Sequence, residues 1–232
     1  MAGGELGVFI LDGHPLTRLG VRHFLSAHRD LTVCGEAADE KDGLSAIQAA
    51  QPDVVVLELV LQGRGGVELI KDIGEHVPEA KCLVYTACAE QLYAERALRA
   101  GALGYVMKSE DPDILVERIR LVAAGHYGVS QAVSSSLLNS FVSTAHPEKR
   151  DCAIGLSCLT DRELQVFELI GQGCTSQAIA TRLCLSVKTI DTYRSSIRRK
   201  LGLSATNGLI HTAVSYARTQ ADGAVSFGGV SS

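Results

Sequence analysis

Five short runs of aliphatic and β-branched residues alternate with longer segments of helical periodicity, and this alternation constrains the fold more than any other feature. The intervening segments, such as 15–28 and 42–51, repeat apolar residues every three or four positions. Such alternation predicts βα units that form a parallel sheet with helices on both faces. The runs are LGVFIL (6–11), LTVCG (31–35), DVVVLEL (53–59), KCLVYTA (81–87) and GYVMK (104–108).

Charged side chains are divided unevenly along the chain. Its 232 residues are enough for two ordinary domains. Residues 1–130 contain 19 acidic and 12 basic side chains, whereas residues 157–218 contain 4 acidic and 8 basic ones. This asymmetry indicates that the smaller, basic part meets a polyanion while the acidic part has another role.

The sequence contains neither a membrane signal nor a pattern for metal binding. No apolar run approaches the roughly 20 residues needed to span a bilayer, and the N-terminus lacks the basic opening of a signal peptide. We therefore expect a cytoplasmic protein with no membrane partner. The seven cysteines include no C-x-x-C pair, and His211 is the only histidine in the C-terminal third, so we expect no disulfide framework, metal or cofactor.

Four of the expected strands are followed by polar residues. Asp12 follows the first strand, Glu58 lies at the end of the third, and Thr86 and Lys108 belong to the ends of the fourth and fifth. In open parallel sheets, functional groups gather at the carboxyl ends of the strands. The sequence therefore predicts a site built from these side chains.

The first part of the chain resembles the receiver domain of bacterial response regulators, particularly the NarL/FixJ group. The resemblance covers residues 6–128 and rests on the ordered motifs LDGHPLTRLGVRHFL, PDVVVLELVLQGRGGVELI, LVYTA, RALRAGALGYVMK and VAAGHYGVS. It implies a flavodoxin-like α/β fold whose five-stranded parallel sheet has the strand order 2-1-3-4-5.

The resemblance also implies a phosphotransfer site, and several of its residues are altered here. Glu58 stands where the family has its phosphoacceptor aspartate, and Gly13 follows Asp12 where the family usually has a second acid that binds Mg²⁺. The loop at 61–66 lacks the proline and the acid of the family's M-P-G-x-D-G pattern.

Other parts of the implied site are retained. Thr86 corresponds to the hydroxyl that senses the phosphoryl group, Tyr105 to its aromatic switch partner, and Lys108 to the phosphate-binding lysine. The resemblance thus describes a degenerate phosphorylation site whose sensing residues survive.

The altered residues argue against phosphorylation. Glutamate carries its carboxylate one methylene further out, and a displacement of about 1 Å can cost roughly 100-fold in rate. With Gly13 in place of an acid, Mg²⁺ is short of its usual oxygen ligands. Glu58 can instead reach Lys108 and the Thr86 hydroxyl. Two interpretations stay open: Glu58 imitates the phosphorylated, active state, or it pairs with Lys108 in a receiver kept as a dimerising scaffold.

Two further hypotheses concern the same part of the chain. The gaps left by Gly13, Gly65 and Gly66 could open a pocket for a small-molecule or protein signal. An enzyme using the strand-end residues is not expected, because they offer no nucleophile paired with a general base.

Residues 129–155 are rich in serine and small side chains, which predicts a linker, with one short helix over 132–143. The predicted receiver therefore comprises residues 1–128.

A helix-turn-helix pattern follows the linker. Thr160 and Glu163 form the signature of a capping box, and Gly173 lies at the end of the helix that they open. A second helix starts at Thr175, and Ser186 is placed as the N-cap of a third that is rich in Lys, Arg, Ser and Thr. Two short helices around a tight turn are typical of DNA readers.

Residues 157–217 resemble the LuxR-type DNA-binding domain, through the motifs L-T-x-R-E, I-A-x-x-L, S-x-K-T-I and R-x-K-L-G-L. The resemblance implies an all-α domain of four helices over 156–218, with a recognition helix at 187–201 and a fourth helix near 205–217. We expect the glycine- and serine-rich tail, 219–232, to be disordered.

Helical geometry sorts the candidate DNA contacts. One face, expected in the major groove, carries Lys188, Asp191, Thr192 and Ser195. An acid such as Asp191 would repel the DNA backbone but could accept a hydrogen bond from cytosine N4. The side chains suited to phosphate contacts are Thr189, Arg194, Arg198, Arg199 and Lys200.

These patterns together predict a transcriptional regulator of the response-regulator type that acts without phosphorylation. Its partner is double-stranded promoter DNA, and a homodimer would place two recognition helices on half-sites about one helical turn apart.

Overall fold

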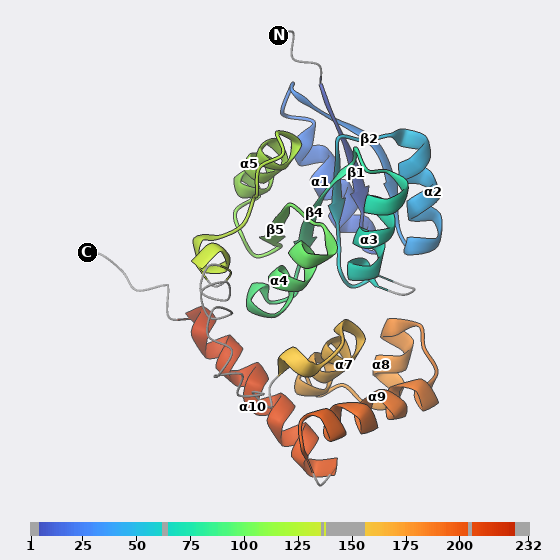
Figure 1. The fold of residues 1–232 in the computed structure, drawn as a ribbon, viewed down its shortest axis with the longest axis vertical. Coiled ribbons are helices and arrows are strands. Elements are labelled where there is room, and N and C mark those ends of the chain that lie inside the picture. Colours follow the sequence, from blue (N-terminus) through green and yellow to red (C-terminus); the bar gives the residue numbers. More distant parts are fainter. Residues whose placement is uncertain (1–4, 62–64, 136, 138–155, 204–205, 226–232) are drawn as a thin grey trace, which may run out of the picture. The chain divides into compact units, whose positions relative to one another are not determined.

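The computed structural model describes residues 5–61, 65–135, 137, 156–203 and 206–225 (Figure 1). The chain divides into two compact units, Met1–Lys149 and Arg150–Ser232. The division falls inside the predicted linker, 129–155. In the described ranges, no helix is both long enough and apolar enough to cross a membrane.

The first unit contains the predicted parallel sheet of five strands in the order β2-β1-β3-β4-β5. This observation confirms the expected order 2-1-3-4-5. The order reverses at β1, which pairs with β2 on one side and β3 on the other, so the carboxyl ends of β1 and β3 lie side by side. The strands are β1 (Leu6–Leu11), β2 (Leu31–Ala37), β3 (Val54–Leu57), β4 (Lys81–Thr86) and β5 (Gly104–Met107).

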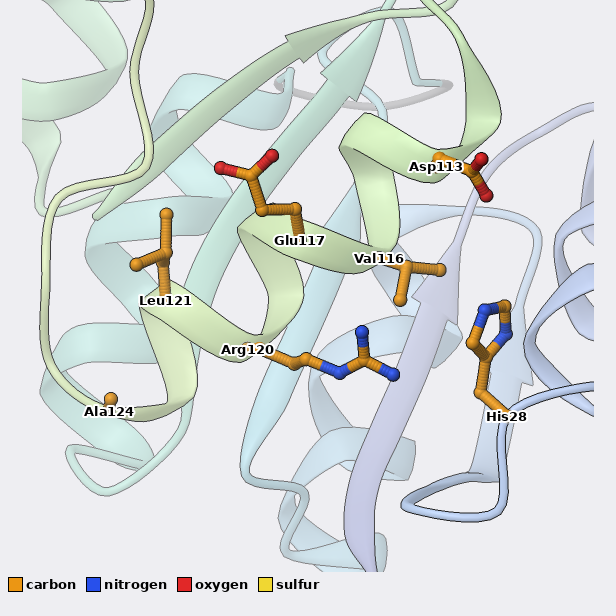
Figure 2. A pocket seen from close by; sticks show the side chains of 7 residues that line it. All are labelled: His28, Asp113, Val116, Glu117, Arg120, Leu121 and Ala124. Carbon is orange, nitrogen blue, oxygen red and sulfur yellow. The ribbon is translucent and has the colours of Figure 1, made fainter.

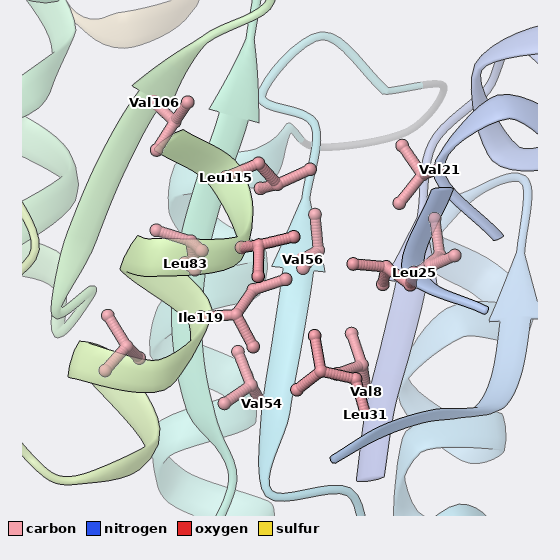
Figure 3. Close-up of a cluster of buried hydrophobic side chains, with 13 residues drawn as sticks. Val8, Val21, Leu25, Leu31, Val54, Val56, Leu83, Val106, Leu115 and Ile119 are labelled. Carbon is pink, nitrogen blue, oxygen red and sulfur yellow. The ribbon is translucent and has the colours of Figure 1, made fainter. Parts of the chain in front are cut away.

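Helices cover both faces of the sheet. A cluster of buried aliphatic side chains joins one face to α1 (Pro15–Leu25) and α5 (Pro112–Ala123) (Figure 3). Burying each such Val, Leu or Ile side chain stabilises the fold by about 1.5–3 kcal/mol, which fixes these helices against the strands. The other helices that pack against the sheet are α2 (Glu40–Ala50), α3 (Gly66–His76) and α4 (Glu90–Ala100) (Figure 1).

The end of the predicted receiver, just before the linker, is tied to the sheet. The Tyr105 amide donates to the carbonyl of Gly128 (3.0 Å), and the Gly128 amide donates to the carbonyl of Leu103 (2.8 Å). Residues 131–135 and 137 are helical, so the short helix starts one residue before the predicted position. The part of the predicted helix beyond residue 137 lies outside the described residues.

The second unit contains the four predicted helices. They are α7 (Asp161–Gly171), α8 (Ser176–Leu183), α9 (Val187–Lys200) and α10 (Thr206–Val225), and a 3-10 turn at Leu156–Cys158 precedes them. The predicted capping box of Thr160 and Glu163 is present, and Ser186 accepts the amide of Thr189 as the N-cap of α9.

The last helix is longer than predicted. It was expected near 205–217, and α10 continues to Val225, so the prediction of disorder is wrong for residues 219–225. Extending an existing helix gains one hydrogen bond per residue, and no proline stops it here. The rest of the predicted tail, 226–232, lies outside the described residues.

Candidate functional sites

The fold brings the predicted strand-end residues into one ionic cluster. The Lys108 ammonium nitrogen lies 2.5 Å from Oδ2 of Asp12 and 2.7 Å from Oε2 of Glu58. Asp12 is 3% exposed and Glu58 4%. One lysine therefore neutralises part of the charge of two buried carboxylates that come from neighbouring strands.

The second oxygen of the Glu58 carboxylate is also engaged. Thr86, which is fully buried, donates its hydroxyl hydrogen to Oε1 of Glu58. The amide of Val60 donates to the same oxygen over 3.0 Å. Because buried carboxylates are stable only when hydrogen-bonded and paired, these donors explain how Glu58 stays in the interior.

Lys108 is held in its charged form. Burial on its own would lower the pKa of its ammonium, but the charges and hydrogen bonds of Glu58 and Asp12 outweigh that effect and raise the pKa above its ordinary value. The cluster is therefore an ion pair network rather than a set of neutral groups.

Tyr105 is joined to the same network through the backbone of Cys88. Its ring is buried, and its hydroxyl donates to the carbonyl of Cys88 (3.0 Å). The Cys88 amide donates to the hydroxyl oxygen of Thr86 over 3.2 Å. Hydrogen bonds thus connect Tyr105 through Cys88 and Thr86 to Glu58.

The residues of this cluster do not fit Mg²⁺, which the receiver resemblance implies. Mg²⁺ prefers an octahedral set of oxygen ligands with help from carboxylates. Both carboxylates are already occupied by Lys108, and Oδ1 of Asp12 accepts the backbone amide of His14 (2.7 Å). Gly13 has no side chain that could add a ligand. The charge that the metal would supply comes here from the lysine.

The predicted opening at the glycines is wrong for Gly66. A Cβ atom there would lie 2.6 Å from the Cα atom of Leu59 and 2.8 Å from the carbonyl oxygen of Glu58, so the site is closely packed. Gly65 has a φ of 117°, a backbone conformation that favours glycine. Gly13 has more room, since its Cβ would meet just the Ala38 carbonyl oxygen, at 3.5 Å.

A separate hollow lies along α5 and the loop before β2 (Figure 2). Arg120 lies beside it and forms a bidentate ion pair with Asp30, at 2.7 and 3.0 Å. None of the residues that line this hollow belongs to the cluster of Asp12, Glu58 and Lys108. They are His28, Asp113, Val116, Glu117, Arg120, Leu121 and Ala124.

In the second unit, α9 has the two faces that helical geometry predicts. Ile190 and Ile197 are fully buried, and Leu201, just after the helix, is 8% exposed. The opposite side is exposed and carries the four residues assigned to the major groove, Lys188, Asp191, Thr192 and Ser195. Arg199 is exposed, while Thr189, Arg194 and Arg198 are half-buried.

Lys200 differs from the other candidate phosphate contacts. Its ammonium nitrogen lies 2.6 Å from Oε2 of Glu163, whose side chain is 5% exposed. Burial would raise the pKa of Glu163, but hydrogen bonds from Lys200, Thr160 and Ser196 outweigh it and lower the pKa to about 2. Lys200 therefore holds α9 against α7.

Sequence reasoning missed two roles in this unit. The sequence pattern predicts only the capping box for Glu163, and it gives no sign of Ser176, which donates its hydroxyl to Oδ1 of Asp191 (3.3 Å). Both contacts join residues of different helices, 37 and 15 positions apart. No local spacing signals such pairs.

A five-stranded parallel sheet with an acid, a hydroxyl and a lysine at its strand ends, followed by a helix-turn-helix unit, defines the class of two-domain response regulators. Residues 8–120 match the response regulator receiver domain, and residues 157–213 match the bacterial regulatory proteins of the luxR family. The chain belongs to the NarL/FixJ family of response regulators.

Curated relatives match over nearly the whole chain. The transcriptional activator protein ExaE of Pseudomonas putida is 30% identical over 209 residues, which cover 90% of this chain and 96% of that protein. The oxygen regulatory protein NreC of Staphylococcus aureus is 31% identical over 208 residues, covering 89% and 96%.

Solved structures show the same architecture. RcsB from Salmonella enterica serovar Typhimurium, bound to a promoter in the presence of the phosphomimetic BeF3-, is 25% identical with a TM-score of 0.60 and covers 91% of this chain and 100% of that chain. A LuxR-family two-component response regulator from Aurantimonas sp. SI85-9A1 is 31% identical with a TM-score of 0.55, over 60% of this chain and 99% of that one.

Proposed function

We propose that this protein is a DNA-binding transcriptional regulator whose receiver works without phosphorylation. The observation that carries the proposal is the set of contacts made by Glu58, which accepts from the Thr86 hydroxyl and pairs with Lys108 at 2.7 Å. By the family resemblance, these two residues are the ones that would hold a phosphoryl group. The carboxylate of Glu58 contacts both of them without any phosphoryl group.

Of the two open interpretations, the contacts favour imitation of the active state over an inert scaffold. A scaffold requires only the ion pair between Glu58 and Lys108. The additional hydrogen bonds from Thr86 to Glu58 and from Cys88 to Thr86 draw the sensing hydroxyl toward the acid, and Tyr105 is buried and bonded to the same backbone segment. We therefore propose that Glu58 holds Thr86 and Tyr105 in the arrangement of the phosphorylated, active state.

The second unit supplies the DNA contacts in this proposal. Lys188, Asp191, Thr192 and Ser195 would enter the major groove, and Thr189, Arg194, Arg198 and Arg199 would meet phosphates. Lys200 is left out of this set because its ammonium pairs with the buried Glu163. A homodimer would present two copies of α9 to a two-fold DNA site.

The proposal is tested by treating the full-length protein with acetyl phosphate and Mg²⁺ and measuring its intact mass. We expect no phosphoryl adduct, and we expect the untreated protein to bind selected duplex DNA. A stoichiometric adduct, or binding that appears only after treatment, would contradict it. Glu58→Gln should weaken DNA binding or dimerisation, with Glu75→Gln, on the exposed part of α3, as the control for lost charge.

A further inference from the structure

The exposed side of α9 has an unusual balance of hydrogen-bond donors and acceptors. We call Lys188, Asp191, Thr192 and Ser195 the reading face, because all four are exposed and share one side of the helix. Lys188, near the start of the helix, is the only one of the four whose side chain carries solely donors. The other three residues lie further along and decide what the middle of the helix can recognise.

Two of these three residues donate their hydroxyl hydrogen to the backbone of α9 itself. The Thr192 hydroxyl donates to the carbonyl of Lys188 and the Ser195 hydroxyl donates to the carbonyl of Asp191, both over 2.9 Å. A hydroxyl has a single hydrogen and two acceptor lone pairs. Thr192 therefore offers acceptor lone pairs and a methyl group outward from the helix. Ser195 accepts from the Arg198 guanidinium over 3.4 Å and keeps one further acceptor lone pair.

Asp191 is an acceptor only, and a neighbouring helix orients it. Ser176, at the start of α8, donates to Oδ1 of Asp191 over 3.3 Å. A carboxylate has about four lone-pair sites, so one donor leaves acceptor capacity for a ligand. Among the residues that the structure describes, none forms an ion pair with Asp191. The carboxylate of Asp191 is therefore free to accept a hydrogen bond from DNA. Its negative charge disfavours a position beside a phosphate.

We infer that the reading face selects base pairs that present an amino group in the major groove, and that Asp191 is a specificity-determining residue for cytosine. This inference rests on the proposed binding of α9 in the major groove. Cytosine presents the N4 amino donor there, whereas guanine presents two acceptors and thymine an acceptor and a methyl group. Adenine has an N6 donor beside the N7 acceptor, which repels a carboxylate, so cytosine suits Asp191 best.

The test is a selection of binding sites from random duplex DNA with the full-length protein, repeated with two substitutions. For the wild type we expect one cytosine in each half-site that is preferred over the other bases by roughly tenfold. Asp191→Asn should move the preference at that position to adenine, because asparagine pairs with N6 and N7 together. Asp191→Ala should remove the preference there and leave the rest of the half-site unchanged.

A matched control separates base reading from loss of charge. Glu75→Gln removes one negative charge from an exposed position on α3 and should select the wild-type half-site. If Asp191→Asn and Asp191→Ala both select the wild-type half-site, the inference is wrong while the proposed DNA binding stands. If the wild-type protein enriches no sequence at all, the proposed function fails and the inference fails with it.

Discussion

Lys200, the last residue of α9, places its ammonium nitrogen 2.6 Å from a carboxylate oxygen of Glu163 in the first turn of α7. Glu163 also closes the capping box with Thr160, whose amide donates to the same carboxylate oxygen over 2.7 Å. One buried acid therefore fixes both the start of α7 and the end of α9. This pair therefore helps to fix α9 against α7.

Lys200→Ala should destabilise the second unit rather than remove a single DNA contact. The substitution leaves Glu163 buried without its cation, and we expect a loss of about 1–3 kcal/mol in the free energy of unfolding. Calorimetry of the full-length protein measures this loss. Arg199→Ala, at the exposed neighbouring position, should leave the melting temperature unchanged and weaken DNA binding. Equal melting temperatures for Lys200→Ala and wild type would contradict the structural role.

The same pair predicts how stability depends on pH. The pKa of Glu163 is about 2 in the folded protein and ordinarily 4.5, so the unfolded state binds its proton more tightly. The stabilisation is complete above pH of about 4.5 and is lost as pH falls toward 2. Allowing for solvent screening, it amounts to about 2 kcal/mol. Calorimetry between pH 3 and 6 should show a steeper decline for wild type than for Glu163→Gln.

Glu58→Gln should destabilise the receiver. A carboxamide keeps the shape of the side chain but leaves Lys108 with only Asp12 as its counter-charge, and we expect a cost of about 1–3 kcal/mol in unfolding free energy. Urea unfolding of the full-length protein, followed by circular dichroism, measures it. An unchanged transition midpoint would show that the pair between Glu58 and Lys108 adds nothing to stability.

Two substitutions together should restore phosphorylation. The space beside Gly13 admits a side chain, since its Cβ would meet only the Ala38 carbonyl oxygen at 3.5 Å, and Glu58→Asp shortens the acid by one methylene. The Gly13→Asp, Glu58→Asp double variant should take up a phosphoryl group from acetyl phosphate when Mg²⁺ is present. Each single variant is a control that lacks one part of the site. An unmodified double variant would contradict the prediction.

Lys188→Ala and Arg194→Ala should each lower the affinity for the selected duplex by about 1–3 kcal/mol. Lys188 lies on the exposed reading face, and Arg194 belongs to the half-buried flank of α9. Fluorescence anisotropy at a fixed salt concentration measures the change, because phosphate contacts make affinity salt-dependent. Lys71→Ala, on the exposed part of α3, removes a positive charge outside α9 and should bind as wild type does.

The sequence by itself determined the architecture of both units. Aliphatic runs and helical repeats depend on neighbours along the chain, so the alternation of strands and helices, the capping box of Thr160 and the N-cap at Ser186 were predicted and are observed. The strand order 2-1-3-4-5, which the family resemblance implies, is observed as well. It also placed Asp12, Glu58, Thr86 and Lys108 at one edge, because carboxyl ends of parallel strands meet there.

Only the tertiary structure decided how those residues are engaged. Lys108 bridges Asp12 and Glu58. Gly66 is packed against the backbone, and Lys200 forms an ion pair with Glu163. Each of these contacts joins side chains or backbone from different elements, and its distance is set by how whole helices and strands pack. Local pattern carries no information about that packing, which is why the sequence predicts a phosphate contact for Lys200 and gives no sign of its pair with Glu163.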